Sequence, residues 1–229
     1  MTRRFPALCA VVSLVFAAPV AAQSGQVYRA QVSGVIELGL APYVARVIET
    51  AAEEGAALVV LDIDTPGGRV DAAERIVDAV RTSPVPVVAY VNPRAWSAGA
   101  MIALAANEIW MAPGGAIGAA TPVDGSGTKA SEKMVSAMRA AFRSLAEARG
   151  RDPALAEAMV DETLDIPELA PEGKLHSLTT RQALEVGMAD GEAATLEALL
   201  ASRGLDNATV VTLSPNWAEA VVRFLTNPI

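Results

Sequence analysis

The sequence predicts an α/β fold, in which helices cover a mainly parallel sheet. Two observations carry this prediction. Short apolar runs, at residues 57–63 and 85–91, are typical of strands that are buried on both faces of a parallel sheet. Each run is followed by a segment with helical character, and repeated alternation of strand and helix gives right-handed crossovers that pack helices on a sheet.

The elements of the first half follow from local patterns. Residues 27–36 alternate weakly between polar and apolar side chains, which indicates a strand, and residues 40–54 carry Val44, Val47 and Ile48 on one helical face. The turn at residues 113–115 separates two short strands. We therefore expect strand 27–36, helix 40–54, strand 57–63, helix 71–81, strand 85–91, helix 98–106 and strands 108–111 and 116–118.

The second half begins with Asp-Gly-Ser-Gly-Thr-Lys at 124–129, which is the most loop-like stretch of the expected mature chain. Gly150 closes the next helix, Asp152 and Pro153 supply a cap and a first-turn proline, and Thr179 or Thr180 caps a later helix. We expect helix 131–149, a helix from 153, strand 175–178, a helix ending at 187, helix 192–202, strand 209–213 and helix 216–225.

Composition limits the possible functions. The 229 residues are 52% hydrophobic and 19% charged, which fits one globular domain with a substantial core. The net charge of −8 argues against nucleic acid and anionic lipid as main partners.

Residues 1–22 have the pattern of a signal peptide, with two arginines, a short apolar run and small residues before Gln23. The alternative is an uncleaved membrane anchor, although the apolar run is short for a spanning helix. Export across the inner membrane is the expectation, to the periplasm or to the membrane surface. Cys9 is the only cysteine, so the mature chain excludes disulfides, thiol catalysis and cysteine-bound metal.

Ser97 is the candidate nucleophile, because it lies between a predicted strand and a predicted helix. A serine there is also a common helix N-cap. A second turn, Asp-Thr-Pro-Gly-Gly at 64–68, follows the predicted strand 57–63. Taken alone, its sequence is typical of an ordinary type II turn. Both turns should emerge at one edge of the sheet. Together they favour acyl-transfer chemistry, with an oxyanion hole made by the backbone N–H groups of Gly68 and Ala98.

The hydroxyl needs a base. His176 is the only histidine, but a lone histidine on a strand is more often a surface residue. A lysine kept neutral by burial is the alternative, and the chain offers Lys129, Lys133 and Lys174. Lys133 is favoured, because apolar surroundings at the start of a helix would disfavour its ammonium form. Lys129 is the second choice, and all three could be simple surface charges.

Three motifs carry a family resemblance: Leu-Asp-Ile-Asp-Thr-Pro-Gly-Gly at 61–68, Ser-Ala-Gly at 97–99 and Met-Ala-Pro-Gly-Gly-Ala-Ile-Gly-Ala at 111–119. Together they resemble the ClpP-class serine peptidases, in particular the NfeD-type membrane-associated proteases, which are related to signal peptide peptidase A. The resemblance covers residues 27–227. It implies a ClpP/crotonase-like spiral of ββα units, with residues 23–229 as one protease domain.

The resemblance also implies a Ser–Lys dyad without metal or cofactor. Counting back from the Ser-Leu-Ala…Gly-Arg pattern at 144–151 places Lys133 at the dyad position, and His176 has no catalytic position. Gly67, Trp96 and Thr121 are expected at the substrate. Trp96 departs from the family, which more often has a small residue there.

The implied substrate is an apolar segment of a membrane protein, such as a stomatin-like partner, and the implied assembly is a homodimer. Long family members continue into membrane helices and a small β-barrel domain, whereas this sequence stops at residue 229. Two alternatives stay open: a crotonase-type acyl-CoA enzyme, and a scaffold that binds a membrane partner without catalysis.

Overall fold

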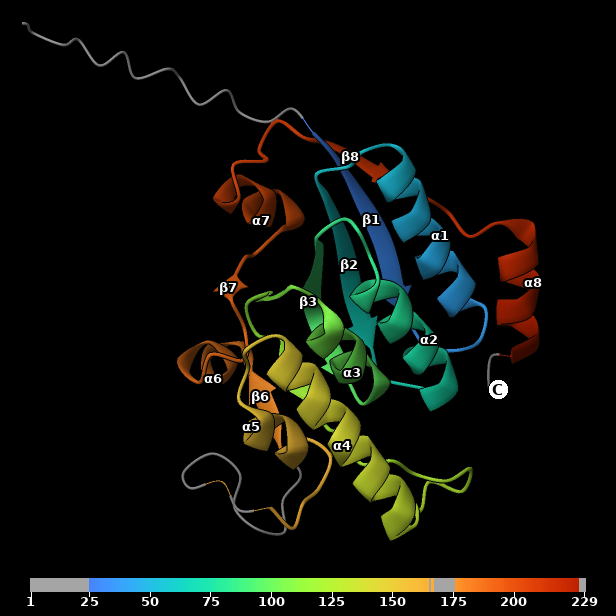
Figure 1. Cartoon of the computed structure of the whole chain (residues 1–229), viewed down its shortest axis with the longest axis vertical. Helices are drawn as coiled ribbons and strands as arrows, with labels where there is room; N and C mark the ends of the chain where they lie inside the picture. Colours follow the sequence, from blue (N-terminus) through green and yellow to red (C-terminus); the bar gives the residue numbers. More distant parts are fainter. Residues whose placement is uncertain (1–24, 165, 167–175, 227–229) are drawn as a thin grey trace, which may run out of the picture.

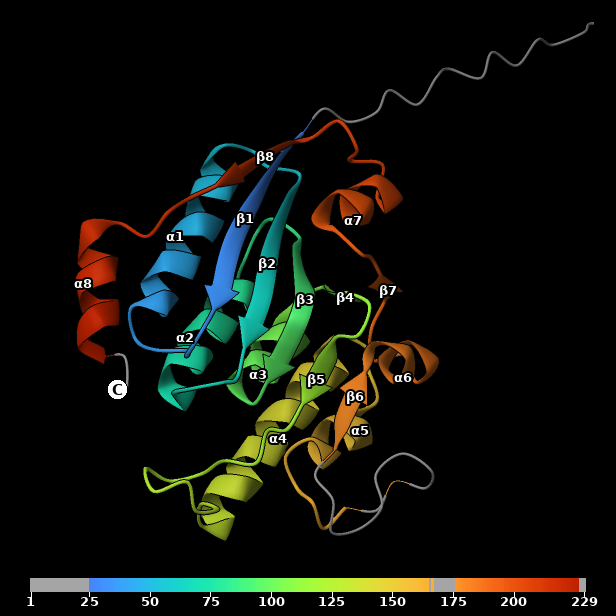
Figure 2. The same ribbon diagram turned by 180° about the vertical axis from the view of Figure 1, so that it is seen from behind.

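The computed structural model describes residues 25–164, 166 and 176–226. The expected signal peptide, Lys174 and residues 227–229 lie outside the described residues. The described strands form one sheet in the order β6-β5-β3-β2-β1-β8, with β4 paired to β3 and β7 paired to β4 (Figures 1 and 2). The strands are β1 (Gln26–Ser33), β2 (Leu58–Thr65), β3 (Val87–Trp96), β4 (Glu108–Met111), β5 (Ala116–Gly118), β6 (Ser177–Thr179), β7 (Gly191–Glu192) and β8 (Thr209–Thr212). The helices are α1 (Leu40–Glu53), α2 (Val70–Arg81), α3 (Ala98–Ala105), α4 (Glu132–Ala148), α5 (Pro153–Ala158), α6 (Thr180–Glu185), α7 (Leu196–Ser202) and α8 (Trp217–Thr226).

The centre of the sheet is parallel, as predicted. β2 lies between β1 and β3 and runs parallel to both, whereas β5 and β6 pair antiparallel. The first four residues of β2, Leu58 to Leu61, are each at most 1% exposed. Their burial explains why this strand is a continuous apolar run in the sequence, because both of its faces are covered.

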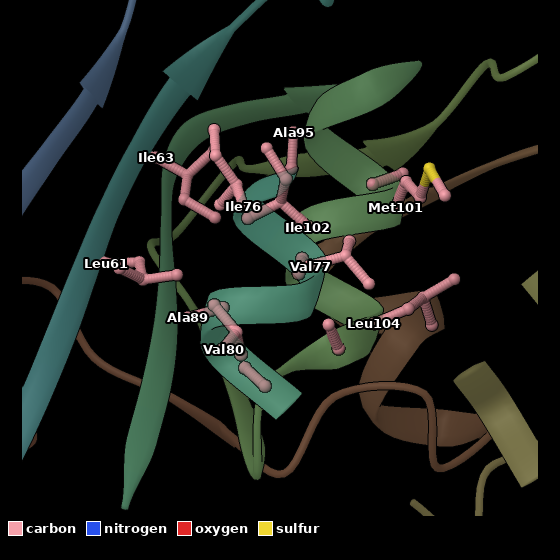
Figure 3. Packing of buried hydrophobic residues seen from close by; sticks show 14 of the residues in the cluster. Leu61, Ile63, Ile76, Val77, Val80, Ala89, Ala95, Met101, Ile102 and Leu104 are labelled. Carbon is pink, nitrogen blue, oxygen red and sulfur yellow. The ribbon is translucent and has the colours of Figure 1, made fainter. Parts of the chain in front are cut away.

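Two apolar layers cover the two faces of the sheet. On one face, β2 residues Leu61 and Ile63 pack toward Ile76 and Val80 of α2 and Ile102 of α3 (Figure 3). On the other face, Leu58 and Val60 belong to a smaller cluster that includes Leu199 and Leu200 of α7. Every residue of α3 is buried, and its small side chains let it lie close to the sheet.

Two element boundaries differ from the prediction. β3 runs five residues past the expected end at 91, because residues 94–96 pair with β5. This extension carries the strand directly to Ser97. α7 begins at Leu196 rather than at 192, because Gly191 and Glu192 pair with β4 and Thr195 caps the helix. The other predicted elements are confirmed to within a few residues where they are described.

The predicted caps at the later helices are confirmed. The Asp152 carboxylate accepts a hydrogen bond from the N–H of Ala154 at 2.8 Å, and Thr179 forms a capping box with Gln182. Within the part of the chain that the structure describes, none of the helices has both the length and the apolar character needed to cross a bilayer.

Candidate active site

Ser97 sits on a sharp turn between β3 and α3. Its backbone φ is 54° and its ψ is −118°, a conformation that costs a residue with a side chain on the order of 1–3 kcal/mol. The turn is held on both sides, because the N–H of Ser97 donates to the Gly118 carbonyl at 2.8 Å and its own carbonyl accepts from the N–H of Ala100 at 3.0 Å. Backbone strain of this kind is concentrated at functional sites.

The Gly67–Gly68 turn lies directly against Ser97. A Cβ on Gly67 would fall 2.6 Å from the Cβ of Ser97, and the φ of Gly67 is 108°. A Cβ on Gly68 would fall 2.2 Å from the Ile36 carbonyl oxygen. Both positions therefore require glycine. The prediction that the two turns meet at one edge of the sheet is confirmed.

Thr65 holds the glycine turn in place. Its hydroxyl donates to the Gly34 carbonyl at 2.6 Å and accepts from the N–H of Gly67 at 3.0 Å. The loop before α1 closes the turn, because the N–H of Ile36 donates to the Gly67 carbonyl at 2.9 Å. These bonds fix the backbone of Gly68 without using its N–H.

The two expected oxyanion donors share one cavity with the serine. Gly68, Ser97 and Ala98 line a cavity of about 70 Å³. The N–H groups of Gly68 and Ala98 have no hydrogen-bond acceptor among the described residues. The rest of the lining is apolar: Val70, Met101, Ala120, Pro122, Val123 and Met138. Such a site can stabilise a negative oxygen beside a nucleophile.

The candidate bases are placed less favourably. Lys133, in the first turn of α4, is exposed and does not line the cavity. The expectation that it has apolar surroundings is therefore wrong for this structure. Met138, five residues later on the same helix, does line the cavity, about 7.5 Å along the helix axis from Lys133.

Lys129, the second choice, is engaged elsewhere. Its Nζ lies 3.0 Å from Oε1 of Glu162. This hydrogen bond raises the pKa of Lys129, which is the opposite of what a general base needs.

His176 is buried, and the expectation of a surface position is wrong. The residue is 3% exposed, and its Nε2 finds no hydrogen-bond partner in the described part of the chain. Burial lowers the pKa of the ring, so the neutral form is favoured. The N–H of Ala119 donates to the His176 carbonyl at 3.1 Å, but the residue does not line the Ser97 cavity.

The expected substrate contacts have mixed positions. Gly67 touches Ser97, whereas the Thr121 hydroxyl donates to the Val160 carbonyl at 2.7 Å. Trp96 is 37% exposed, and the guanidinium of Arg94 lies 5.6 Å from the centre of its ring. Neither Trp96 nor Thr121 lines the cavity.

The sequence analysis missed an ion pair beside the site. Arg94, which stacks on Trp96, also donates from Nε to Oδ1 of Asp64 at 2.7 Å. The signal that could have located the pair is that Asp64 begins one of the two turns and Arg94 lies three positions before Ser97 in the other. Within the described ranges, no three His, Cys, Asp or Glu side chains are grouped as a metal would require.

Comparisons with known proteins show the family to which the chain belongs. The family model described as NfeD1b, N-terminal domain, matches residues 26–213. The chain is 42% identical over 209 residues to Membrane protein NfeD1b of Bacillus subtilis, covering 91% of this chain and 48% of the relative. It is 31% identical over 245 residues to Membrane-bound protease PH1510 of Pyrococcus horikoshii, covering 96% and 53%. The chain thus spans about half the length of the curated relatives it matches.

Solved structures give the same result. A serine-to-alanine mutant of the 1510-N membrane-bound stomatin-specific protease matches with a TM-score of 0.73 and 31% identity, over 84% of this chain and 99% of that one. A lysine-to-alanine mutant of the same protease, in complex with a substrate peptide, matches with a TM-score of 0.75 and 29% identity, over 89% and 98%. These neighbours confirm the predicted ClpP-like α/β fold.

Proposed function

The chain belongs to the family of NfeD1b N-terminal domains, and from that premise we propose that it is a serine endopeptidase of the ClpP class. One observation carries the proposal. The strained serine lines the same cavity as Gly68 and Ala98, whose N–H groups have no hydrogen-bond acceptor in the described part of the chain. A nucleophile that faces two fixed donors is the arrangement that acyl transfer requires.

In the proposed mechanism, Oγ of Ser97 attacks a peptide carbonyl carbon and its proton passes to the neutral amine of Lys133. The N–H groups of Gly68 and Ala98 hold the resulting oxyanion. The C–N bond then breaks, and Lys133 returns the proton to the leaving amine. A water molecule then gives a proton to Lys133 and attacks the acyl carbon. The bond between that carbon and Oγ breaks, Lys133 returns the proton to Oγ, and the carboxylic acid product leaves.

Lys133 acts as the base only if its side chain moves to Ser97. Two facts support its choice over Lys129. Lys133 lies in the first turn of α4, the helix that reaches the cavity through Met138, whereas Lys129 is paired with Glu162. That the base is a lysine is supported by the relative, in which a lysine was the residue mutated in the peptide complex. We propose that substrate draws the segment 122–131 and the start of α4 toward the serine.

The proposed substrate is an apolar segment of a membrane protein, with a stomatin-like protein as the first candidate. The apolar lining of the cavity supports an apolar peptide. The solved relative is named a stomatin-specific protease, which supports the second part. A homodimer, expected from the family resemblance, is part of the proposal.

We also propose that the protein works at a membrane, on the side reached by export. The names of both curated relatives, a membrane protein and a membrane-bound protease, support this location. The signal-peptide pattern at residues 1–22 supports export.

The alternatives have less support. Among the described residues no carboxylate lines the Ser97 cavity, whereas an acyl-CoA hydratase or isomerase needs a carboxylate base there. A scaffold without activity is favoured by one observation, the exposed position of Lys133.

The experiment that tests the proposal compares three variants on a fluorogenic apolar peptide. Ser97→Ala and Lys133→Ala should each lower turnover about 100-fold or more, while the control Lys129→Ala should stay within about twofold. Circular dichroism checks that each variant is folded. A serine-directed fluorophosphonate should modify Ser97, and mass spectrometry should locate the label on that residue.

Each outcome has a consequence. Unchanged turnover in Ser97→Ala ends the peptidase proposal. If Lys129→Ala abolishes turnover and Lys133→Ala does not, the assignment of Lys133 as the base is wrong. If the parent protein neither cleaves nor reacts with the probe, the scaffold is the better function.

A further inference from the structure

Helix α8 directs its polar side chains toward α1 and the loop before it. Glu219 is buried, and two oxygens of its carboxylate each lie 2.8 Å from a nitrogen of Arg46 on α1. Arg223, one turn later, places Nε 3.0 Å from Oε1 of the buried Glu37, and Thr226 donates to Oε2 of the same carboxylate at 2.8 Å. Positions 219, 223 and 226 share one helical face, so that face is the one attached to the domain.

Close backbone contact fixes this orientation. A Cβ on Gly39 would fall 2.7 Å from the backbone nitrogen of Arg223 and 2.8 Å from the Glu219 carbonyl oxygen. The helix therefore lies directly on the start of α1. Both views place α8 at the outer edge of the molecule beside α1 (Figures 1 and 2).

The opposite face of α8 is apolar and exposed. Trp217 is 81% exposed, Phe224 83% and Leu225 73%. Val221, which is 49% exposed and follows Trp217 by four residues, extends the same surface, which we call the α8 apolar face. A surface helix normally buries its apolar face and exposes its polar one. In α8 this arrangement is reversed, which indicates that the apolar face meets another apolar phase.

The size of the surface bears on what that phase is. An exposed aromatic side chain contributes about 150–250 Å², so the α8 apolar face offers on the order of 500 Å². A stable dimer buries about 800 Å² per partner. A second copy of the chain therefore needs more surface than this face provides, whereas a bilayer accepts any exposed apolar helix face without a matching shape.

Position and composition favour the bilayer. Trp, Phe and Leu are side chains that interfacial helices insert at the boundary between lipid head groups and acyl chains. α8 begins four residues after the stretch matched by the N-terminal domain model, residues 26–213. The curated relatives, both named as membrane-located, are about twice as long as the matched region.

We propose that the α8 apolar face docks the domain on a phospholipid bilayer, with Glu219 and Arg223 fastening the helix to the domain. The proposal rests on the proposed location at a membrane and is independent of the peptidase chemistry. Because the chain has a net charge of −8, the lipid contact is apolar rather than electrostatic, and it should persist on zwitterionic lipid at high salt.

Flotation with phosphatidylcholine vesicles tests the proposal, using the chain from residue 23 onward, which contains every described helix and strand. The triple variant Trp217→Ser, Phe224→Ser, Leu225→Ser should lower the vesicle partition constant at least tenfold. The matched control Met134→Ser, which alters a residue 47% exposed on α4, should stay within twofold. Cleavage of a soluble peptide by the triple variant should equal that of the parent, so loss of docking and loss of catalysis are separable.

A second measurement needs no destabilising change. Brominated phosphatidylcholine should quench the tryptophan fluorescence of the parent protein, and Trp217→Phe should remove the quenched component. Equal flotation of parent and triple variant overturns the proposal. The proposal is also overturned if the parent does not bind vesicles but sediments as a dimer that the triple variant cannot form. The α8 apolar face would then be covered by a second copy of the chain.

Discussion

Replacing Gly67 with alanine probes the link between the glycine turn and catalysis. The φ of 108° at Gly67 costs an alanine on the order of 1–3 kcal/mol. In addition, the new Cβ would lie 2.6 Å from Cβ of Ser97, whereas carbon atoms in contact are about 3.5–4.0 Å apart. The turn must therefore move by roughly 1 Å, and the N–H of Gly68 moves with it.

That movement should remove one oxyanion donor. Loss of such a donor costs about 3 kcal/mol of transition-state stabilisation, which corresponds to a roughly 150-fold lower kcat/KM. The assay is cleavage of a fluorogenic apolar peptide, with urea unfolding in parallel. The free energy of unfolding should fall by about 1–3 kcal/mol.

Gly55→Ala is the matched control. Gly55 also has a positive φ, 64°, but nothing lies within 4 Å of the Cβ position. It should lose about 1–2 kcal/mol of stability and keep its activity. If Gly67→Ala cleaves the peptide within twofold of the parent, the glycine turn does not form the oxyanion hole.

Three further predictions concern the turn, the core and α8. Thr65→Val removes a hydroxyl that bonds Gly34 and Gly67. The free energy of unfolding, measured with urea, should therefore fall by about 1–3 kcal/mol, and peptide cleavage should also fall. Full activity would mean that the turn keeps its shape without Thr65. Ile102→Ala empties a fully buried site on α3 and should cost about 2–5 kcal/mol in the same assay, with a loss under about 1 kcal/mol contradicting the packing described above. Arg46 lowers the pKa of the Glu219 carboxyl. The stability that this ion pair contributes is therefore present at pH 7 and is lost as the pH falls through the lowered pKa. Glu219→Gln should flatten this part of the curve of unfolding free energy against pH, and identical curves for parent and variant would refute the linkage.

The sequence predicted the centre of the sheet and the pair of turns because these features are local. The apolar runs that become β2 and β3 are continuous, and the glycines at 67 and 68 lie just after the end of β2 at Thr65. The length of β3 was not predictable in the same way, because its last three residues are strand only through pairing with β5. The start of α7 depends likewise on the pairing of β7 with β4.

The side-chain environments that the sequence analysis missed are set by distant residues. His176 is buried because β6, which follows it, pairs with β5, and no local pattern distinguishes this from an exposed strand. The helix at α8 was predicted, but its orientation was not, because its polar partners Arg46 and Glu37 lie on and just before α1. The exposed position of Lys133 likewise depends on how α4 is placed and not on its neighbours in sequence.

The pairing of β1 with β8 has a consequence for biosynthesis. β1 lies inside the sheet, and among the described strands only β8, residues 209–212, pairs with one of its edges. A nascent or cleaved chain that lacks those residues leaves the backbone donors and acceptors of β1 open to other unfolded chains. This edge of β1 can therefore be paired only after residue 212 has been synthesised, so a chain that stops before that residue is prone to aggregate.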